Sequence, residues 1–498
     1  MRYYLGIDIG TYESKGVLVD GEGHIVASAA QPHRMLVPRA GWAEHDADKD
    51  WWADLVAICR SIFAESRVDP ASIRAVGVSG IGPCMLPVDE AGTPLMNAVL
   101  YGVDTRAAQE IEELTDRIGL DRLLNECGNS LTSQSVGPKI LWLKRNRPDI
   151  FDRTHKILNS SSYLVYKLTG RHVIDHYSAC GSTPLYSAKS LAWDDSYADL
   201  IIPPEKLPEL LWTTDIAGAV TQEAAETTGL AAGTPVIAGT IDAAAEAVSV
   251  GVLGSGDMMI MYGSTIFIIM LTSERVRDPR LWYSPWLFRG QHACMSGLAT
   301  SGTLTHWFRE RFAGELDPAT AMETLAREAA QSPAGARGLV VLPYFSGERT
   351  PIHDPHAKGV IFGLDLTHGR ADIYRAFLEG IAYGVNHIVE TYAEAGQMPA
   401  EIAAVGGGTR NKVWSQAVSD TIGRDQTIRE RTIGASYGDA FLAAVAVGDA
   451  KREDICRWNP IERKIKPDPS HASIYARQFD IYKRLYAQTK DLMAEISG

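Results

Sequence analysis

"YYLGIDIGTYESKGVLVDGEGHIVASAA", residues 3–30, contains three apolar runs of strand length. Turns at Gly10-Thr11 and at Asp20–Gly23 separate them, so the pattern predicts three short strands joined by tight turns. Residues 256–274, GDMMIMYGSTIFIIMLTSE, repeat the order of strand, glycine-hydroxyl turn and strand. The sequence therefore predicts two similar β-meander domains, each presenting the backbone N–H groups of one turn.

The rest of the chain alternates helical and strand patterns, which indicates an α/β fold. Apolar residues recur at helical spacing from Trp51 to Ile62, with Asp46 or Asp48 as the N-cap. Buried strands are expected over 73–80 and 234–242, and a long helix is expected over 371–395. At 498 residues the chain exceeds what one core usually holds. We therefore expect two domains, at 1–245 and 246–498.

Composition excludes several classes of function. Hydrophobic residues make up 45% and charged residues 22% of the chain, as in ordinary globular proteins. The net charge of -13, from 48 basic and 61 acidic residues, argues against a nucleic-acid partner. The N-terminus lacks a signal-type apolar core, and the longest apolar run is too short to span a membrane. Six widely spaced cysteines without a CxxC pair indicate buried thiols, so we expect a cytoplasmic protein.

Asp242 is set among valine, isoleucine and alanine, with a glycine and a threonine shortly before it in AGTID. An unpaired carboxylate out of water costs several kcal/mol, so such a residue usually has a partner or a task. One interpretation is structural: Asp242 precedes AAAEAVSVG, a good helix former, and can be its N-cap. The other interpretation is catalytic.

Two turns have the composition of phosphate sites. In DIGTYESKG, backbone N–H groups of Gly10 and Thr11 can approach a phosphate, with Lys15 as a further donor. Asp8 is placed to hold Mg²⁺ through water. The second turn comprises Gly263, Ser264 and Thr265. An ordinary hairpin explains either turn alone, but two such turns and one apolar-flanked carboxylate are what phosphoryl transfer from a nucleotide needs.

The segment VGGGTRN, residues 405–411, matches neither the P-loop nor the dinucleotide fingerprint. Its three glycines allow a ligand to approach the backbone closely, and a tight strand-to-helix turn is the alternative. The thirteen histidines show no metal-ligand spacing, so a zinc site is not expected.

Taken together, these segments resemble the FGGY carbohydrate kinases, and among them most closely the xylulokinases. The resemblance covers nearly the whole chain. It lies in the following segments: GIDIGT from Gly6, GWAEHDADKDWW from Gly41, GVSG from Gly77, LYGVDTRA from Leu100, AGTIDAAAEA from Ala238, YGST from Tyr262, SGERTPIHDPHAKGVIFGLDL from Ser346, VGGGTRN from Val405 and TIGASYGDAFLAA from Thr432. It implies two ribonuclease-H-like domains of the actin and hexokinase type that flank a cleft for the sugar and for MgATP.

The resemblance also assigns roles to residues. Asp242 matches the general base that takes the proton from the sugar hydroxyl, and Asp8 matches the carboxylate near the metal. The predicted ATP contacts are Gly10, Thr11, Lys15, Gly263, Ser264, Thr265, Gly407, Gly408, Asn411, Ser436 and Gly438, of which the last two border the adenine. The first domain would hold the sugar and the base, and the second would hold ATP.

The predicted sugar site departs from the family pattern. Xylulokinases usually carry glutamine, methionine and histidine after the "SG" of the third strand, where this chain has residues 81–84, IGPC. We expect substrate contacts from Gly82, Pro83 and Asp104 in addition to Asp242. The resemblance implies phosphorylation of a terminal hydroxyl, with D-xylulose first and another ketose, a deoxy sugar or a polyol as the alternative. An actin-like or chaperone-like ATPase acting on a protein partner is the alternative of a different class.

An amphipathic helix is expected near the C-terminus, over residues 470–496. Its apolar positions include Ile474, Phe479, Ile481, Leu485 and Leu492. Packing within the second domain explains this apolar face, and a contact between two subunits of a homodimer is the alternative.

Overall fold

The predicted meander at the start of the chain is present in the computed structural model, which describes residues 2–497. β1 (Tyr3–Ile9) pairs antiparallel with β2 (Glu13–Asp20), and β2 pairs antiparallel with β3 (Ile25–Pro32). β5 (Ile73–Gly80) covers the predicted range and lies parallel to β1 on its other side. The first turn, Gly10–Tyr12, therefore connects β1 to its antiparallel neighbour β2, while β5 lies parallel to β1 on the other side.

The first sheet is mixed and has the order β13-β14-β5-β1-β2-β3, with β15 also paired to β5. Its remaining strands are β13 (Ile216–Ala219), β14 (Pro235–Ile237) and β15 (Thr240–Ile241). β14 and β15 occupy the segment in which a buried strand was expected and lead directly into α9 (Asp242–Ser249).

The second sheet repeats this order of strands. It runs β18-β19-β17-β16-β22-β23-β24, in which β16 pairs antiparallel with β17 and parallel with β22. Its strands are β16 (Asp257–Tyr262), β17 (Ile266–Thr272), β18 (Trp282–Pro285), β19 (His292–Leu298), β22 (Glu401–Val405), β23 (Gln426–Arg429) and β24 (Ile461–Ile465). β16 thus corresponds to β1, and the predicted α/β fold with two similar meander domains is confirmed.

The chain forms two compact units that interleave the predicted domain ranges. Unit 1 comprises Met1–Leu253, Tyr283–Ala293 and Ile433–Pro460. Unit 2 comprises Gly254–Trp282, Cys294–Thr432 and Ile461–Gly498. Late residues therefore enter unit 1, because α14 (Ala435–Ala446) packs against its sheet.

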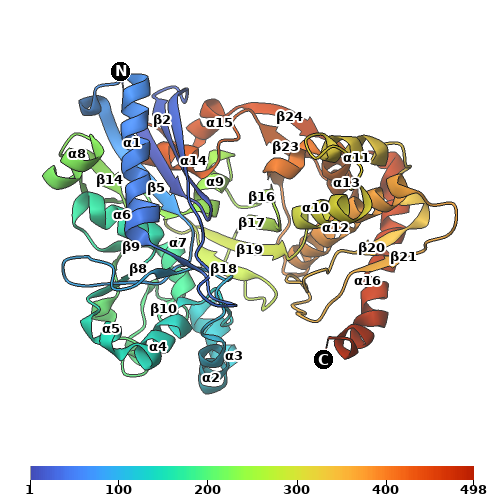
Figure 1. Ribbon diagram of the computed structural model, residues 1–498, viewed down its shortest axis with the longest axis horizontal. Helices are drawn as coiled ribbons and strands as arrows, with labels where there is room; N and C mark the ends of the chain where they lie inside the picture. The colour runs from blue at the N-terminus through green and yellow to red at the C-terminus, as the bar shows by residue number, and fades with distance from the viewer. Residues whose placement is uncertain (1, 498) are drawn as a thin grey trace. The chain divides into compact units, whose positions relative to one another are not determined.

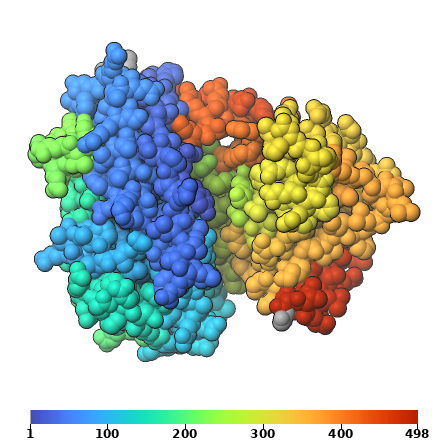
Figure 2. Space-filling view, in the orientation of Figure 1, coloured from blue at the N-terminus to red at the C-terminus, as the bar shows by residue number. Residues whose placement is uncertain are grey.

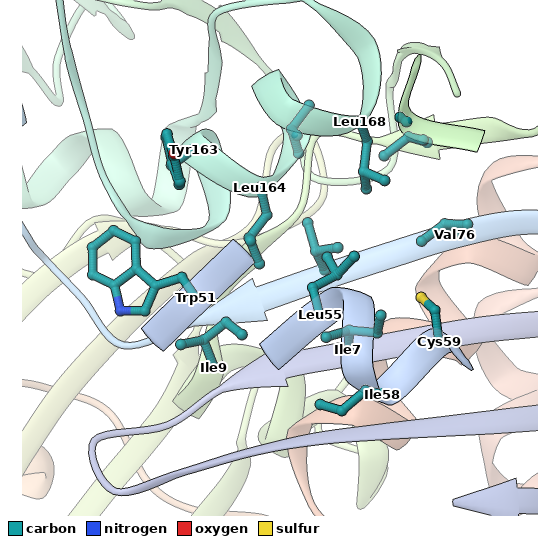
Figure 3. Close-up of a cluster of buried hydrophobic side chains, with 14 of the residues drawn as sticks. Ile7, Ile9, Trp51, Leu55, Ile58, Cys59, Val76, Tyr163, Leu164 and Leu168 are labelled. Carbon is teal, nitrogen blue, oxygen red and sulfur yellow. The ribbon is translucent and has the colours of Figure 1, made fainter. Parts of the chain in front are cut away.

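One face of the first sheet is covered by α1 (Ala53–Ser66) and α6 (Ser160–Thr169). Figure 3 shows Ile7 and Ile9 of β1 among apolar side chains of these helices, with Leu55 from α1 and Leu164 from α6. α1 follows a π-helical segment, Ala47–Trp52, whose N-cap is Asp46, as predicted. In the space-filling view α1 forms part of the visible surface of unit 1 (Figure 2).

The other face of this sheet carries α14 at very short distance (Figure 1). A Cβ atom on Gly6 of β1 would lie 1.9 Å from the carbonyl oxygen of Ser436, and one on Gly77 of β5 would lie 2.1 Å from that of Asp439. Gly6 and Gly77 face α14, and because they have no side chains, the helix can pack directly on the sheet. The close approach brings Asp439 to the carboxyl end of β1 and β5.

Unit 2 has its own helical layers around α12 (Arg370–Glu394), which confirms the predicted long helix. The other helices named below are α10 (Gly302–Phe312), α13 (Lys412–Ile422) and α16 (Ala472–Glu495). α16 packs within unit 2, where the hydroxyl of Tyr482 lies 2.7 Å from that of Tyr344. Packing thus explains Ile474, Phe479, Ile481 and Leu485 of the apolar face, but Leu492 is exposed. The homodimer stays a prediction.

Five of the six cysteines are buried, as expected, whereas the expectation is wrong for Cys456, which is exposed. Over residues 2–497, none of the helices combines the length and the apolar character that a bilayer crossing requires.

Candidate active site

Three residues of unit 1 meet at the carboxyl end of β1 and β5. Asp8 of β1 and Ser79 of β5 are direct partners in the parallel pairing, and the Ser79 hydroxyl lies 3.2 Å from Asp8 Oδ1. The same hydroxyl lies 2.6 Å from Oδ2 of Asp439 on α14. Alternation along the strands places Asp8 and Ser79 on the face that α14 covers. Ser79 therefore connects two carboxyl groups.

The contacts of Ser79 require a proton on one of these two carboxyl groups. A hydroxyl carries a single proton and can donate to only one carboxylate, so the second contact is a hydrogen bond only if a carboxyl group is protonated. Asp439 is fully buried, and its Oδ1 has no hydrogen-bond partner among residues 2–497. Burial raises the pKa of Asp439 well above its ordinary value, with a further rise from Asp8 and Asp242 against the effect of Ser79. Asp439 is therefore the neutral member.

Asp242 is the first residue of α9, where the first sheet ends. Its Oδ1 accepts the N–H of Ala243 at 2.7 Å, and its side chain is half-buried. The helix N-cap is Ile241, which has no capping side chain, so the interpretation of Asp242 as N-cap is wrong. Burial raises the pKa of Asp242 well above its ordinary value, and the negative charges of Asp8 and Glu246 raise it further. Apart from the Ala243 N–H, Asp242 thus has no structural hydrogen-bond partner in the described residues.

Two more charged groups belong to the same cluster. Burial and the charge of Asp8 raise the pKa of Glu246, one turn further along α9, to about 7, against the effect of Lys15. Burial likewise raises the pKa of Asp8 to about 6, although Ser79 and Lys15 lower it. Lys15 is the cross-strand partner of Asp8, and its Nζ lies 3.1 Å from Glu13 Oε2. A cation near phosphate oxygens would relieve this excess of acidic groups.

In the first predicted phosphate turn the Gly10 N–H is not available to a ligand, because it donates to the Glu13 carbonyl oxygen at 3.1 Å; the next two N–H groups are unbound and the carbonyl groups are bound. The carbonyl oxygens of Gly10 and Thr11 lie 3.0 Å and 3.1 Å from ring nitrogens of two histidines. A trans peptide holds its C=O and N–H on opposite sides, so the N–H groups of Thr11 and Tyr12 point away from the histidines. Within residues 2–497 these two N–H groups have no acceptor. They are free to bind an anion.

The second predicted turn, Gly263–Thr265 in unit 2, is arranged in the same way. The carbonyl oxygen of Gly263 accepts the N–H of Gly302 at 3.0 Å, and that of Ser264 accepts the N–H of Thr303 at 3.1 Å. The N–H groups of Ser264 and Thr265 therefore point away from α10, and in the described part of the chain neither has an acceptor. Each turn thus offers two successive N–H groups that are unbound and could bind an anion.

The glycines of VGGGTRN differ in what surrounds them. Gly406 has a positive φ of 91° and packs on the Tyr262 backbone, and a Cβ on Gly408 would lie 2.4 Å from the Trp414 ring. Gly407 is exposed and a Cβ there would meet nothing within 4 Å. Asn411 caps α13 by accepting the Trp414 N–H at 3.2 Å. The structure thus shows packing roles for Gly408 and Asn411 and an open backbone at Gly407, while their contacts with ATP stay predictions.

Ser436 and Gly438 lie in α14 and so belong to unit 1. Ser436 is fully buried, and a Cβ on Gly438 would lie 1.9 Å from the Ala245 carbonyl oxygen of α9. Their visible role is close packing between helix and sheet and between two helices. The predicted contact with adenine stays a prediction.

The predicted sugar contacts also lie in unit 1. Gly82 and Pro83 are half-buried, and a Cβ on Gly82 would lie 2.8 Å from the Ile241 side chain, next to Asp242. Asp104 is fully buried; it accepts the Ala43 N–H at 2.7 Å and pairs with the Arg106 guanidinium at 2.8 Å. Gly82 and Pro83 thus lie near the candidate base, whereas the structure shows Asp104 as half of a buried ion pair.

Our sequence interpretation missed several residues that the structure brings together. They are His33, His45, Ser79, Glu246 and Asp439. Asp439 carried a usable signal, because an aspartate within SYGDAFLAA is as anomalous as Asp242 within its apolar surroundings. The two histidines carried none, since their partners are backbone carbonyl groups.

The donor set fits a magnesium ion of the kind that kinases use. Mg²⁺ usually keeps several waters and is bound by one or two carboxylates plus substrate phosphates. In the described residues, no group of three or more histidine, cysteine or acidic side chains could hold a metal alone. Asp8 supplies one half-buried carboxylate with one oxygen oriented by Ser79. With nucleotide bound, Asp8 would hold the ion, which would neutralise phosphate charge.

Comparisons with known proteins show the family of the chain. Residues 3–249 match the N-terminal domain and residues 258–447 the C-terminal domain of the FGGY family of carbohydrate kinases. The chain is 28% identical to the xylulose kinase of Bacillus subtilis, over 99% of this chain and 98% of that protein. It is 29% identical to the xylulose kinase of Escherichia coli K12, over 99% and 100% of the two chains.

A solved structure gives the same result. The crystal structure of xylulose kinase from Rhodospirillum rubrum superposes with a TM-score of 0.93 at 31% identity, over 99% of this chain and 100% of that one. The two-unit α/β fold, the carboxyl cluster and both family domains lead to one conclusion. The chain belongs to the FGGY family of carbohydrate kinases.

Proposed function

We propose that this carbohydrate kinase transfers the terminal phosphoryl group of ATP to a terminal hydroxyl of a small ketose, with D-xylulose to D-xylulose 5-phosphate as the first candidate reaction. The observation that supports this proposal is the environment of Asp242. Its carboxyl group is half-buried and accepts only the Ala243 N–H among the described residues, and burial, Asp8 and Glu246 raise its pKa. A general base works best when its pKa lies near the working pH. The environment of Asp242 moves it in that direction.

In the proposed reaction Asp242 takes the proton of the sugar hydroxyl while the oxygen of that hydroxyl bonds to the terminal phosphorus of ATP. The bond from that phosphorus to the bridging oxygen breaks, ADP leaves, and the proton passes from Asp242 to solvent. Phosphoryl transfer needs mainly positioning and charge neutralisation. The unbound N–H groups of the Gly10–Tyr12 turn would bind phosphate oxygens beside Asp8. The Gly263–Thr265 turn would bind others.

The choice of sugar rests on weaker support than the reaction. Relatives at 28–31% identity are named xylulose kinase, which favours D-xylulose. The segment Gly82-Pro83 offers neither a charged nor an amide side chain beside Ile241, so one hydroxyl contact of the substrate is lost there. This observation favours the second candidate, another ketose, a deoxy sugar or a polyol.

The test is ADP release by the purified protein with MgATP across pentuloses, deoxy sugars, polyols and sugar acids. We expect D-xylulose to give the highest kcat/KM and release to be negligible without sugar. A higher kcat/KM for another sugar would replace D-xylulose and keep the kinase. ADP release that no sugar stimulates but a protein partner does would instead support the ATPase alternative.

A further inference from the structure

Two buried histidines of unit 1 bind the carbonyl groups of the first phosphate turn. His33 Nε2 lies 3.0 Å from the Gly10 carbonyl oxygen, and His45 Nε2 lies 3.1 Å from that of Thr11. The His33 side chain is 5% exposed and His45 is 0% exposed. The rings contact each other edge to face at 4.9 Å between centroids. Because each ring nitrogen has a defined hydrogen-bond partner, the partners indicate which nitrogens carry a proton.

His45 is a neutral imidazole with a fixed tautomer. The indole N–H of Trp51 points to its Nδ1 at 3.0 Å, and an indole N–H can only donate. Nδ1 therefore accepts, and Nε2 carries the proton that is donated to the Thr11 carbonyl. Burial and the neighbouring His33 lower the pKa of His45 to about 4. Geometry and environment agree on the neutral form.

His33 has acceptors at both ring nitrogens. Nε2 faces the Gly10 carbonyl, and Nδ1 lies 2.8 Å from Asp54 Oδ2, which also accepts the Ser14 hydroxyl at 2.7 Å. Neither the carbonyl nor the ionised carboxylate can donate, so both ring nitrogens must carry protons. The hydrogen bond to Asp54 and the charge of Asp54 favour the protonated imidazole. His33 is therefore an imidazolium cation.

We propose that His33 and His45 are positioning residues for the nucleotide phosphate, and that His33 acts as a charged imidazolium directly behind the Gly10–Tyr12 turn. They hold two successive carbonyl groups back, so that the Thr11 and Tyr12 N–H groups face the ligand. The backbone N–H of His33 also donates to the Tyr12 carbonyl at 3.0 Å. This inference rests on the proposed use of ATP and adds a charge that the turn itself lacks.

The charge on His33 is set by groups from several elements. Asp54 of α1 and Asp50 of the preceding π-helical turn favour the cation, whereas the ring of His45 faces it without charge. Burial lowers the pKa of His33, but the hydrogen bond and charge of Asp54 and the Gly10 carbonyl outweigh burial and raise it. These groups therefore favour the cation, which is lost as the pH rises through this raised pKa.

Histidine-ring ¹H–¹⁵N spectra of the wild-type protein test the protonation directly, with His33→Gln and His45→Gln to assign the signals. We expect both nitrogens of His33 to be protonated at pH 7 and only Nε2 of His45. A neutral His33 at pH 7 would overturn the proposal. This readout needs no catalysis, so it is independent of the proposed function.

Calorimetric titration with MgATP at pH 6.5 and pH 9 tests the consequence. His33→Gln should weaken binding about tenfold at pH 6.5. The wild type should approach this variant at pH 9, while His45→Gln weakens binding by the same factor at both pH values. The titration of the nucleotide itself cancels, because all three proteins bind the same ligand. If His33→Gln bound MgATP as tightly as the wild type at pH 6.5, the positioning role would be refuted, whether or not any sugar is phosphorylated.

Discussion

The two phosphate turns have the same geometry but different supports. In unit 2, backbone N–H groups of Gly302 and Thr303 bind the carbonyl groups of the Gly263–Thr265 turn. In unit 1, ring nitrogens of His33 and His45 bind the carbonyl groups of the Gly10–Tyr12 turn. Backbone amides do not titrate in the working range, whereas imidazoles do. Equivalent turns can thus differ in their response to pH.

The strands before the turns differ in a second way. Asp8 lies two residues before Gly10 on β1, and the corresponding position before Gly263 on β16 is Met261. The acidic residues Asp8, Asp242, Glu246 and Asp439 all belong to unit 1. In the proposed mechanism the repeated architecture would therefore place proton transfer and metal binding in one copy and leave phosphate binding to both.

The largest effect is expected from Asp242→Asn. The amide keeps the size of the side chain but cannot take a proton, so kcat should fall about 10²- to 10⁴-fold. MgATP binding and the melting temperature should change little, because Asp242 has no structural partner beyond the Ala243 N–H. Steady-state kinetics with the best sugar, together with calorimetry, measures both. A variant with more than a tenth of wild-type kcat would remove Asp242 as the base.

The asymmetry of the strands is tested by the pair Asp8→Asn and Met261→Leu. Loss of the carboxylate should raise the Mg²⁺ concentration needed for half-maximal activity about 10- to 100-fold. Met261→Leu conserves volume at the equivalent position and should change it less than about threefold. Activity measured against Mg²⁺ concentration compares the two. Equal shifts in both variants would mean that the effect comes from strand packing and not from the carboxylate.

Much of the fold could be predicted because its signals are local. The apolar runs of residues 3–30 and the range of β5 were predicted within a residue or two, as was the helix at 371–395. Strand alternation and helical spacing repeat over short distances, so a single sequence shows them. Asp242 could be singled out for the same reason: its apolar surroundings lie in its own segment.

The parts that escaped prediction depend on contacts between distant segments. Asp439 reaches Ser79 only because Gly6 and Gly77 admit α14 to the sheet, and this contact joins residues 360 positions apart. Likewise, His33 and His45 act on carbonyl groups of the first turn, which no side-chain pattern reveals. The structure therefore adds the environment of the predicted residues more than their identity.

Gly302→Ala tests the backbone support of the second turn. A Cβ at this position would lie 2.4 Å from the Gly263 carbonyl oxygen, so the turn must shift. Overpacking of this kind costs about 1–3 kcal/mol, which predicts a KM for ATP about tenfold higher or more. Because no titratable group is involved, the ratio to wild type should be equal at pH 6.5 and pH 9. A ratio that changes with pH would contradict the proposed difference between the turns.

The smallest effect concerns stability and is expected from Asp439→Asn. Burial raises the pKa of Asp439 far above that of the unfolded chain. The folded state therefore favours the protonated acid, and its contribution to stability is full below the unfolded pKa near 4 and falls as the pH rises toward the folded pKa. An amide in this place stays neutral at every pH and can still donate a hydrogen bond to Ser79. Asp439→Asn should consequently melt close to wild type at pH 5 and about 2 °C higher or more at pH 8.

The matched variant Asp439→Leu loses the bond to Ser79 and should be less stable than Asp439→Asn at both pH values, by about 1–3 kcal/mol. If Asp439→Asn were instead less stable than wild type at pH 8, Asp439 would be ionised in the folded protein, and the proton between the two carboxyl groups would belong to Asp8.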